Sequence, residues 1–182
     1  MVESDELVLP PEAAAEAGTF LRAGGAGEEG TIAALMRCAA ELCEGFTGTV
    51  LLARGFAERL RPSGRWQALA RRPVRAISAA QNVAADGTLQ PLPPELYETD
   101  IDGEGVGRVR FAATAGGRVR IAYEAGLATL WEDAPAALRH GVIRMAAHLY
   151  GARTDGEAGE RRLEPPAAVT ALWRPYRRLR LR

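Results

Sequence analysis

The clearest hydrophobic pattern in the chain predicts a helix over residues 28–45. Apolar side chains recur there at intervals of three and four residues, which is the spacing of one helix face, at Ile32, Leu35, Met36, Ala39, Leu42, Cys43 and Phe46. Glu28 and Glu29 suit the positive N-terminal end of this helix, and Gly45 or Gly48 is expected to end it. A shorter helix is predicted over residues 11–23, between two prolines and a glycine-rich stretch.

The pattern changes after residue 48, where short apolar runs alternate with turn signals. The runs predict strands at residues 49–60, 74–83, 96–101, 107–112 and 118–123. Arg108–Phe111 and Arg118–Ile121 both alternate polar with apolar residues, as half-buried strands do. Gly116-Gly117 between them favours a hairpin that joins these two strands. We therefore expect a small antiparallel sheet, inserted between helices over about residues 49–124.

A helical pattern returns near the C-terminus. Leu138, Val142, Met145, Ala146 and Leu149 predict a helix over residues 134–151. Residues 151–165 are polar and contain glycine, which favours a flexible linker. Val169, Leu172, Trp173 and Tyr176 then follow helical spacing in a C-terminal segment, 166–182, that ends in an arginine-rich tail. The predicted class is α+β: a small bundle of about four helices with an inserted antiparallel sheet, forming a single domain over residues 1–150.

Length and composition fit this architecture. The 182 residues are 47% hydrophobic and 25% charged, values typical of a soluble globular domain that needs no disulfide or metal for stability. No stretch approaches the roughly 18 apolar residues of a membrane span, so no membrane contact is expected. The N-terminus lacks the basic-then-apolar order of a signal peptide. We expect a protein made in the bacterial cytoplasm.

The chain contains no lysine, and all 23 basic residues are arginine. This excludes P-loop phosphate binding, Schiff-base chemistry and kinase-type phosphoryl transfer, each of which requires a lysine. Charge is also unevenly distributed. Residues 1–30 carry a net charge of −6, whereas residues 165–182 carry +5. This gradient predicts two interaction surfaces of opposite sign, and two solvated tails are the alternative.

No motif in the sequence indicates a catalytic, cofactor-binding or metal site, so we expect no enzyme activity. Cys38 and Cys43 lie about 140° apart around a helix, and His140 and His148 lie about 12 Å apart along one, so neither pair is spaced to share a metal. The sequence from Asp100 to Glu104 departs from a calcium loop and is expected to form a hairpin turn. None of the three serines lies in a nucleophile motif.

The C-terminal segment is the strongest candidate for a binding site. It combines tryptophan, tyrosine and arginine, the residue types most enriched at interface hot spots. The residues that we expect to contact a partner are Val169, Leu172, Trp173, Arg174, Tyr176, Arg177, Arg178, Arg180 and Arg182. An alternative for Trp173 is that it only anchors the last helix to the core. The arginines are also suited to phosphate contacts, whose affinity falls with salt.

Several short motifs, taken in order, resemble the head–tail connector (adaptor) family of tailed bacteriophages and gene transfer agents. The resemblance extends over about residues 10–182. Its first three motifs are Phe20-Leu21-Arg22 at the end of a Pro-Glu-Ala helix, Glu44-Gly45-Phe46-Thr47-Gly48, and Arg72-Pro73-Val74-Arg75-Ala76-Ile77. The later motifs are Asp86-Gly87-Thr88, Pro135 with Leu149-Tyr150-Gly151-Ala152-Arg153, and Leu172-Trp173-Arg174-Pro175-Tyr176-Arg177-Arg178.

This resemblance implies a structural role in the neck of a virion or phage-like particle. Connectors form a ring, typically dodecameric, beneath the portal protein. The ring extends the DNA channel without recognising sequence and offers a surface to the next neck or tail (stopper) protein. The family's C-terminal segment reaches into the portal, and here that segment is residues 166–182. The resemblance also implies that deletion after Ala168 abolishes portal binding and leaves the fold intact. The alternative function is a small cytoplasmic nucleic-acid-binding module that uses the arginine tail.

Overall fold

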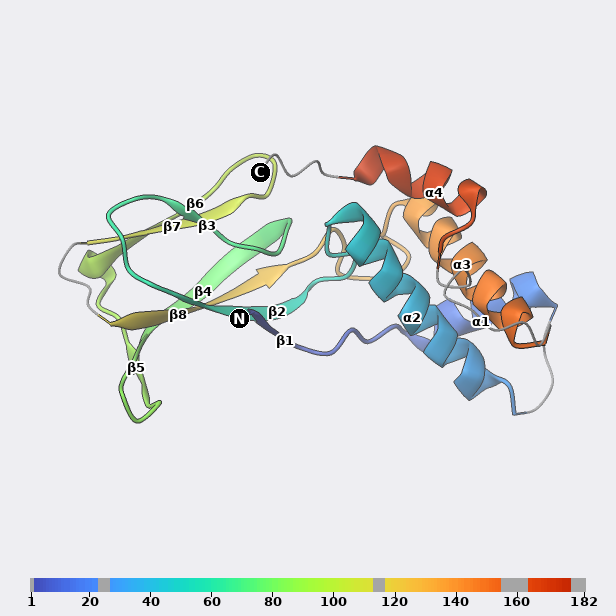
Figure 1. Cartoon of the computed structure of the whole chain (residues 1–182), viewed down its shortest axis with the longest axis horizontal. Coiled ribbons are helices and arrows are strands. Elements are labelled where there is room, and N and C mark those ends of the chain that lie inside the picture. Colours follow the sequence, from blue (N-terminus) through green and yellow to red (C-terminus); the bar gives the residue numbers. More distant parts are fainter. Residues whose placement is uncertain (1, 23–26, 113–116, 155–163, 178–182) are drawn as a thin grey trace. The chain divides into compact units, whose positions relative to one another are not determined.

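The structure is a computed structural model that describes residues 2–22, 27–112, 117–154 and 164–177. It divides into two compact units. The β unit comprises residues 1–6 and 52–127, and the helical unit comprises residues 7–51 and 128–182. Figure 1 shows strands in the first unit and helices in the second. The predicted α+β class is confirmed, and the strand region that we expected as an insertion forms a compact unit of its own.

The β unit contains two antiparallel sheets. The larger has the order β1-β2-β8-β4-β5 and the smaller has the order β3-β7-β6. The strands of the larger sheet are β1 (Val2–Ser4), β2 (Arg54–Leu60), β4 (Val74–Val83), β5 (Leu89–Pro91) and β8 (Arg118–Ala125). Those of the smaller sheet are β3 (Gln67–Ala68), β6 (Tyr97–Ile101) and β7 (Gly107–Phe111), with a 3-10 turn, η1 (Pro94–Leu96), before β6. Three short strands, β1, β3 and β5, were not predicted from the sequence.

Alternate residues of both sheets form the core of the β unit. In β7, Val109 and Phe111 are buried, and in β8, Val119, Ile121 and Tyr123 are buried, while the arginines between them are partly or fully exposed. The smaller sheet lies over the larger one in Figure 1. The sheets approach closely at Gly107, where a Cβ would lie 2.8 Å from the Val74 Cγ2 atom. The period-two pattern therefore correctly predicted which side chains face inward.

The predicted hairpin between residues 107–112 and 118–123 is wrong. β7 pairs with β6 and β3 in the smaller sheet, whereas β8 lies between β2 and β4 in the larger one. A Gly-Gly pair is a local signal that a chain reversal is tolerated, and it does not determine which strand becomes the partner. Here β8 pairs along its length with β2 on one edge and β4 on the other, so it is the central strand of the larger sheet.

The helical unit contains α1 (Pro11–Leu21), α2 (Glu29–Thr47), α3 (Ala136–Thr154) and α4 (Ala167–Trp173), followed by a 3-10 turn, η3 (Arg174–Tyr176). All four predicted helices are present, and their ends move by a few residues. Of the two candidate stop signals, Gly48 ends α2, because it adopts a left-handed conformation with φ of 69°. α3 continues to Thr154, so the first residues of the predicted linker are helical. Residues 155–163 of that linker lie outside the described residues.

Apolar side chains, several of them small, fill the core of the helical unit. Met36, Ala39 and Ala40 of α2 and Val142 and Met145 of α3 are essentially inaccessible to solvent. Two hydrogen bonds connect distant segments at the edge of this core. The Trp131 Nε1–H donates to the Glu16 carboxylate at 2.9 Å, and the Tyr150 hydroxyl donates to the Glu28 carboxylate. Small residues allow close helix packing, which leaves space for the C-terminal segment.

Candidate functional site

The described part of the C-terminal segment packs as the fourth helix of the helical unit. α4 begins after Pro166, whose carbonyl accepts hydrogen bonds from the Val169 and Thr170 amides at 2.8 and 3.0 Å. Proline at this position suits a helix start because the first backbone amides need no partner inside the helix. α4 lies beside α3 in Figure 1. This position determines which side chains of the segment are buried.

Trp173 is the anchor of α4 and is fully buried. Its indole lies against Gly141 of α3, where even a single added Cβ would overlap the ring. Its ring centroid is 5.9 Å from that of Phe46 in α2, in a tilted arrangement. Val169, one turn earlier, is also buried. Gly141 of α3 therefore provides the space into which the tryptophan fits, and Phe46 of α2 completes this seat.

The charged residues of the segment lie on its outer side. Arg174 and Arg177 are exposed, and Leu172 and Tyr176 are half-buried. The Arg177 guanidinium lies over the Phe46 ring, with its Cζ atom 5.4 Å from the ring centroid. Arg178, Arg180 and Arg182 lie outside the described residues. The described arginines thus extend outward from a tryptophan-anchored base.

This placement separates the predicted partner-binding residues into two groups. Val169 and Trp173 belong to the core of the helical unit, as the alternative for Trp173 expected. Deletion after Ala168 would remove both of these buried side chains, so we now expect this truncation to destabilise the helical unit. Arg174 and Arg177, with the half-buried Leu172 and Tyr176, have surface available for a partner. Their role in partner binding stays a prediction, as does that of the three arginines beyond residue 177.

The other candidate side chains have ordinary structural environments. Burial, together with the nearby Glu44 carboxylate, raises the pKa of the Cys43 thiol to about 12. Burial and Glu41 also raise the pKa of Cys38, so both thiols are less reactive than a free cysteine. His140 is exposed and meets Phe20 edge to face, with 5.9 Å between ring centroids. Within the described residues, no group of three histidine, cysteine, aspartate or glutamate side chains is placed to hold a metal ion.

The Asp100–Glu104 sequence forms the turn between β6 and β7, as predicted. The Asp102 carboxylate accepts hydrogen bonds from the Glu104 amide at 3.0 Å and the Val106 amide at 2.9 Å. It also pairs with Arg108 at 2.7 Å. The hydrogen bond from Val106 is the main cause that holds the pKa of Asp102 below its usual value. The carboxylate is therefore fully used in stabilising a hairpin.

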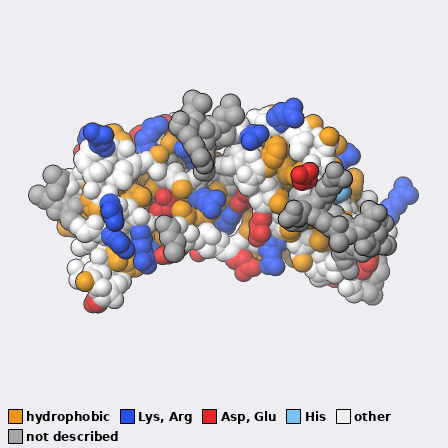
Figure 2. All heavy atoms as spheres, viewed as in Figure 1, with side chains coloured by type: hydrophobic (Ala, Val, Ile, Leu, Met, Phe, Trp, Pro, Cys, Tyr) orange, Lys and Arg blue, Asp and Glu red, His pale blue; other side chains and the backbone are white. Residues whose placement is uncertain are grey.

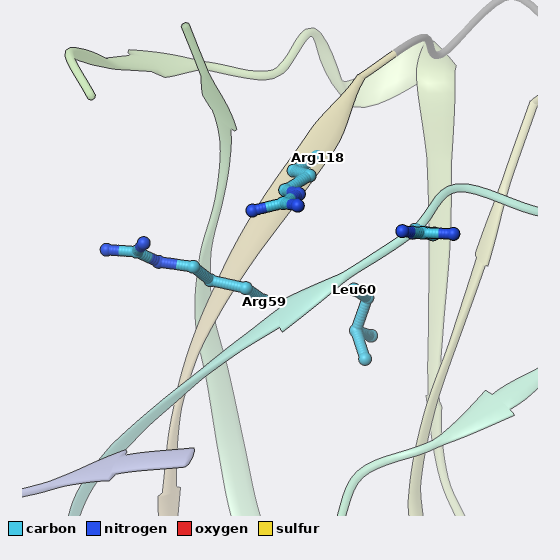
Figure 3. A pocket seen from close by; sticks show the side chains of 4 residues that line it. Arg59, Leu60 and Arg118 are labelled. Carbon is cyan, nitrogen blue, oxygen red and sulfur yellow. The ribbon is translucent and has the colours of Figure 1, made fainter. Parts of the chain in front are cut away.

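A cluster of arginines on the β unit was missed by the sequence analysis. Arg59, Arg61 and Arg118 line one cavity, together with Leu60 (Figure 3). The sequence carried a signal for it, because Arg59-Leu60-Arg61 and Arg118-Val119-Arg120 repeat the same arginine–apolar–arginine order. Only the pairing of β2 with β8 brings these two triplets together.

Comparisons with known proteins identify similar solved structures. No protein-family model matches the chain, and no curated protein matches it. Chains from three solved structures match at 28% identity, each covering all of this chain and 97% of its own length. They come from the neck of an empty gene transfer agent particle computed with C6 symmetry, the virion of a native gene transfer agent particle, and the neck of a native particle computed with C12 symmetry. Their TM-scores are 0.78, 0.75 and 0.74 respectively.

The chain is similar to a neck protein of gene transfer agent particles. The similarity extends through both units, so it is not limited to a common helical bundle or sheet. It supports a structural neck component and agrees with the predicted location in the neck of a virion or phage-like particle. Among the described residues, no helix is long and apolar enough to cross a membrane.

Proposed function

We propose that this protein is a head–tail connector, or adaptor, that assembles into a ring in the neck of a phage or gene transfer agent particle. The observation that carries the proposal is the full-length similarity, at 28% identity, to chains from gene transfer agent necks and virions. Two of the similar structures were computed with C6 and C12 symmetry, which supports a ring of repeated copies, and a dodecamer is the expected form.

The ring would lie beneath the portal protein, extend the DNA channel without sequence recognition, and present its other side to a stopper or tail protein. The proposed portal contact is the outer side of the C-terminal segment. Arg174 and Arg177 are exposed on a base that Trp173 holds in place, and Arg178, Arg180 and Arg182 continue the same charge. Each guanidinium is suited to a bidentate pair with a carboxylate on the partner.

Co-sedimentation with the portal protein encoded nearby tests this function. The full chain is mixed with portal at low and moderate salt, and the complexes are examined by electron microscopy. We expect a ring on the portal that persists at moderate salt. The absence of a complex at both salt concentrations would overturn the connector proposal.

A truncation after Tyr176 tests the role of the C-terminal arginines. It removes residues 177–182 and retains Val169 and Trp173 in the core, so the helical unit is expected to fold. Combined with R174Q, it should abolish portal binding. The control is R75Q/R108Q/R110Q, which removes three arginines of the β unit that already pair with acidic side chains. Wild-type portal binding by the truncated protein would show that the arginines are not the contact.

The alternative function is a nucleic-acid-binding module that uses the same tail. The net charge of +5 in residues 165–182 is the observation that favours it. This alternative predicts that the isolated protein binds DNA, that binding weakens steeply with salt, and that the truncation removes it. The connector proposal predicts that the truncation removes portal binding even at a salt concentration where no DNA is bound.

A further inference from the structure

The pairing of β2 with β8 places four arginines on one face of the larger sheet. Arg59 and Arg120 are direct Cα partners across the two strands. Leu60 pairs with Val119, and Arg61, the residue after β2, lines the same cavity as Arg59 and Arg118. Residues two apart in a strand point to the same side, so Arg118 lies on the same side of β8 as Arg120, and the four arginines form one cluster. We call these four residues the arginine array.

The array lies on the outward face of the β unit. Val119 and Ile121, which alternate with the arginines of β8, are buried, so the arginines point away from the core. Arg59, Arg61 and Arg118 are exposed and Arg120 is half-buried. Together with Leu60, the three exposed arginines line a cavity of about 300 Å³ (Figure 3). Basic side chains gather over this end of the β unit on the face seen in Figure 2.

One carboxylate forms ion pairs with two arginines of the array. Glu3 of β1 lies 3.3 Å from Arg59 and 3.4 Å from Arg120, and it is itself half-exposed. Gln81 of β4 accepts a further hydrogen bond from Arg120 at 3.2 Å. Within the described residues, the Arg61 and Arg118 guanidiniums have no acidic partner. Four positive charges therefore share one negative charge.

Folding does not explain this arrangement. Like charges directly opposite each other on neighbouring strands destabilise a sheet, and here Arg59 lies directly opposite Arg120. Three other arginines on the strands of this unit are arranged differently. Arg75 pairs with Glu124, Arg108 with two aspartates and Arg110 with Glu98, at distances between 2.6 and 3.4 Å. The array is thus a local excess of donors beside strand arginines that have acidic partners.

We propose that the arginine array binds the phosphodiester backbone of double-stranded DNA. Exposed guanidiniums in an open cavity match phosphate oxygens by bidentate hydrogen bonds. A protein-docking surface of this size usually has a buried aromatic anchor at its centre, and the described lining of this cavity contains none. The contact would be independent of base sequence, because phosphate contacts position a protein and do not read bases. This inference stands on the array itself and does not require the portal contact.

The test measures binding of a 20-base-pair duplex to the full-length protein by fluorescence anisotropy between 50 and 200 mM salt. The variant R59Q/R61Q/R118Q removes three donors and leaves Arg120 paired with Glu3. The control R75Q/R108Q/R110Q changes the net charge equally within the same unit. Circular dichroism and thermal unfolding verify that both variants fold.

Each phosphate contact contributes about 0.9 to the slope of log affinity against log salt, so the array variant should lower that slope by about three. Over this salt range the wild type should lose about 40-fold more affinity than the array variant does. The control should keep the wild-type slope. Equal effects of the two variants, or no duplex binding by the wild type at 50 mM salt, would overturn the proposal.

A second ligand distinguishes DNA from an acidic protein surface. A synthetic peptide of residues 1–30 of this chain carries a net charge of −6 and represents the acidic segment of a neighbouring copy. Peptide binding that depends on the array, without duplex binding, would overturn the DNA proposal and assign the array to contacts between copies. Portal co-sedimentation is measured on the same variants, so failure of the connector function is recognised separately.

Discussion

The two units of this protein are stabilised in different ways. The helical unit has an apolar core in which one large side chain, Trp173, lies in a space left by Gly141. The β unit buries a carboxylate: Glu58 is 6% exposed and accepts hydrogen bonds from the Tyr123 hydroxyl and, at 2.7 Å, from the Ala70 amide. Shape complementarity therefore dominates in the first unit, and a polar network contributes to the second.

This difference has consequences for where each unit is vulnerable. An apolar seat tolerates changes of charge around it but not changes of volume. A buried carboxylate tolerates little change in its donors, because each donor left without a partner costs free energy. The Tyr123 hydroxyl, which also accepts from the Arg71 amide at 3.3 Å, connects the Glu58 site to the loop before β4. Changes of side-chain volume should therefore destabilise the helical unit most, and loss of hydrogen-bond partners should destabilise the β unit most.

Replacing Trp173 with alanine should give the largest effect. The change empties the seat beside Gly141 and Phe46, and removal of a fully buried tryptophan costs about 3–5 kcal/mol. Urea denaturation followed by circular dichroism measures the loss. L172A is the matched control, since Leu172 is the half-buried neighbour on the same helix. Similar losses for W173A and L172A would mean that α4 is not anchored by the tryptophan.

The variant E58A tests the polar network of the β unit. It leaves the Tyr123 hydroxyl and the Ala70 amide without their shared acceptor, and we expect a loss of about 2–4 kcal/mol in the free energy of unfolding. E58Q keeps an acceptor oxygen and should lose less. E98A is the control, because the exposed Glu98–Arg110 pair contributes no more than about 1 kcal/mol. If E58A and E98A were equally stable, the buried carboxylate would not stabilise this unit.

Two glycines of α3 provide a comparison within one helix. In G141A the added methyl group meets the Trp173 indole, and we expect a loss of about 1–3 kcal/mol from overpacking. In G151A nothing lies within 4 Å of the new methyl group, so the helix should be unchanged or stabilised by up to about 1 kcal/mol. Thermal unfolding measures both. The double variant G141A/W173A should lose less than the sum of its single variants, and strict additivity would contradict the proposed seat.

Sequence patterns predicted the elements better than their partners. The spacing of apolar residues located all four helices, since a helix is determined by contacts within one segment. Pairing of strands depends on segments far apart, and the Gly-Gly signal before β8 therefore led to the wrong neighbour. The same limit hid the arginine array: each arginine triplet is visible in the sequence, but only the pairing of β2 with β8 places Arg59 opposite Arg120 and brings the two triplets together.

The C-terminal segment shows a second limit of sequence patterns. Val169 and Trp173 have the spacing and the residue types of both a docking helix and a core helix. Hot-spot composition does not distinguish these alternatives, because aromatic residues dominate both interfaces and cores. The deciding residue is Gly141, which lies 32 positions away from Trp173 and leaves room for its indole. A glycine inside a predicted helix was the available signal for a close-packed neighbour.

The last prediction concerns Cys43 and the dependence of the free energy of unfolding on pH. Its pKa rises from 9.0 to about 12 on folding, mainly because the thiol is buried. The unfolded chain therefore releases this proton above pH 9 while the folded chain keeps it. The stabilising contribution is complete below pH 9 and is lost as the pH rises toward 12, at a rate of up to about 1.4 kcal/mol per pH unit. Urea denaturation at pH 8, 9 and 10 measures this slope. C43A should show a shallower slope than the wild type, and parallel slopes would mean that the thiol does not titrate differently in the two states.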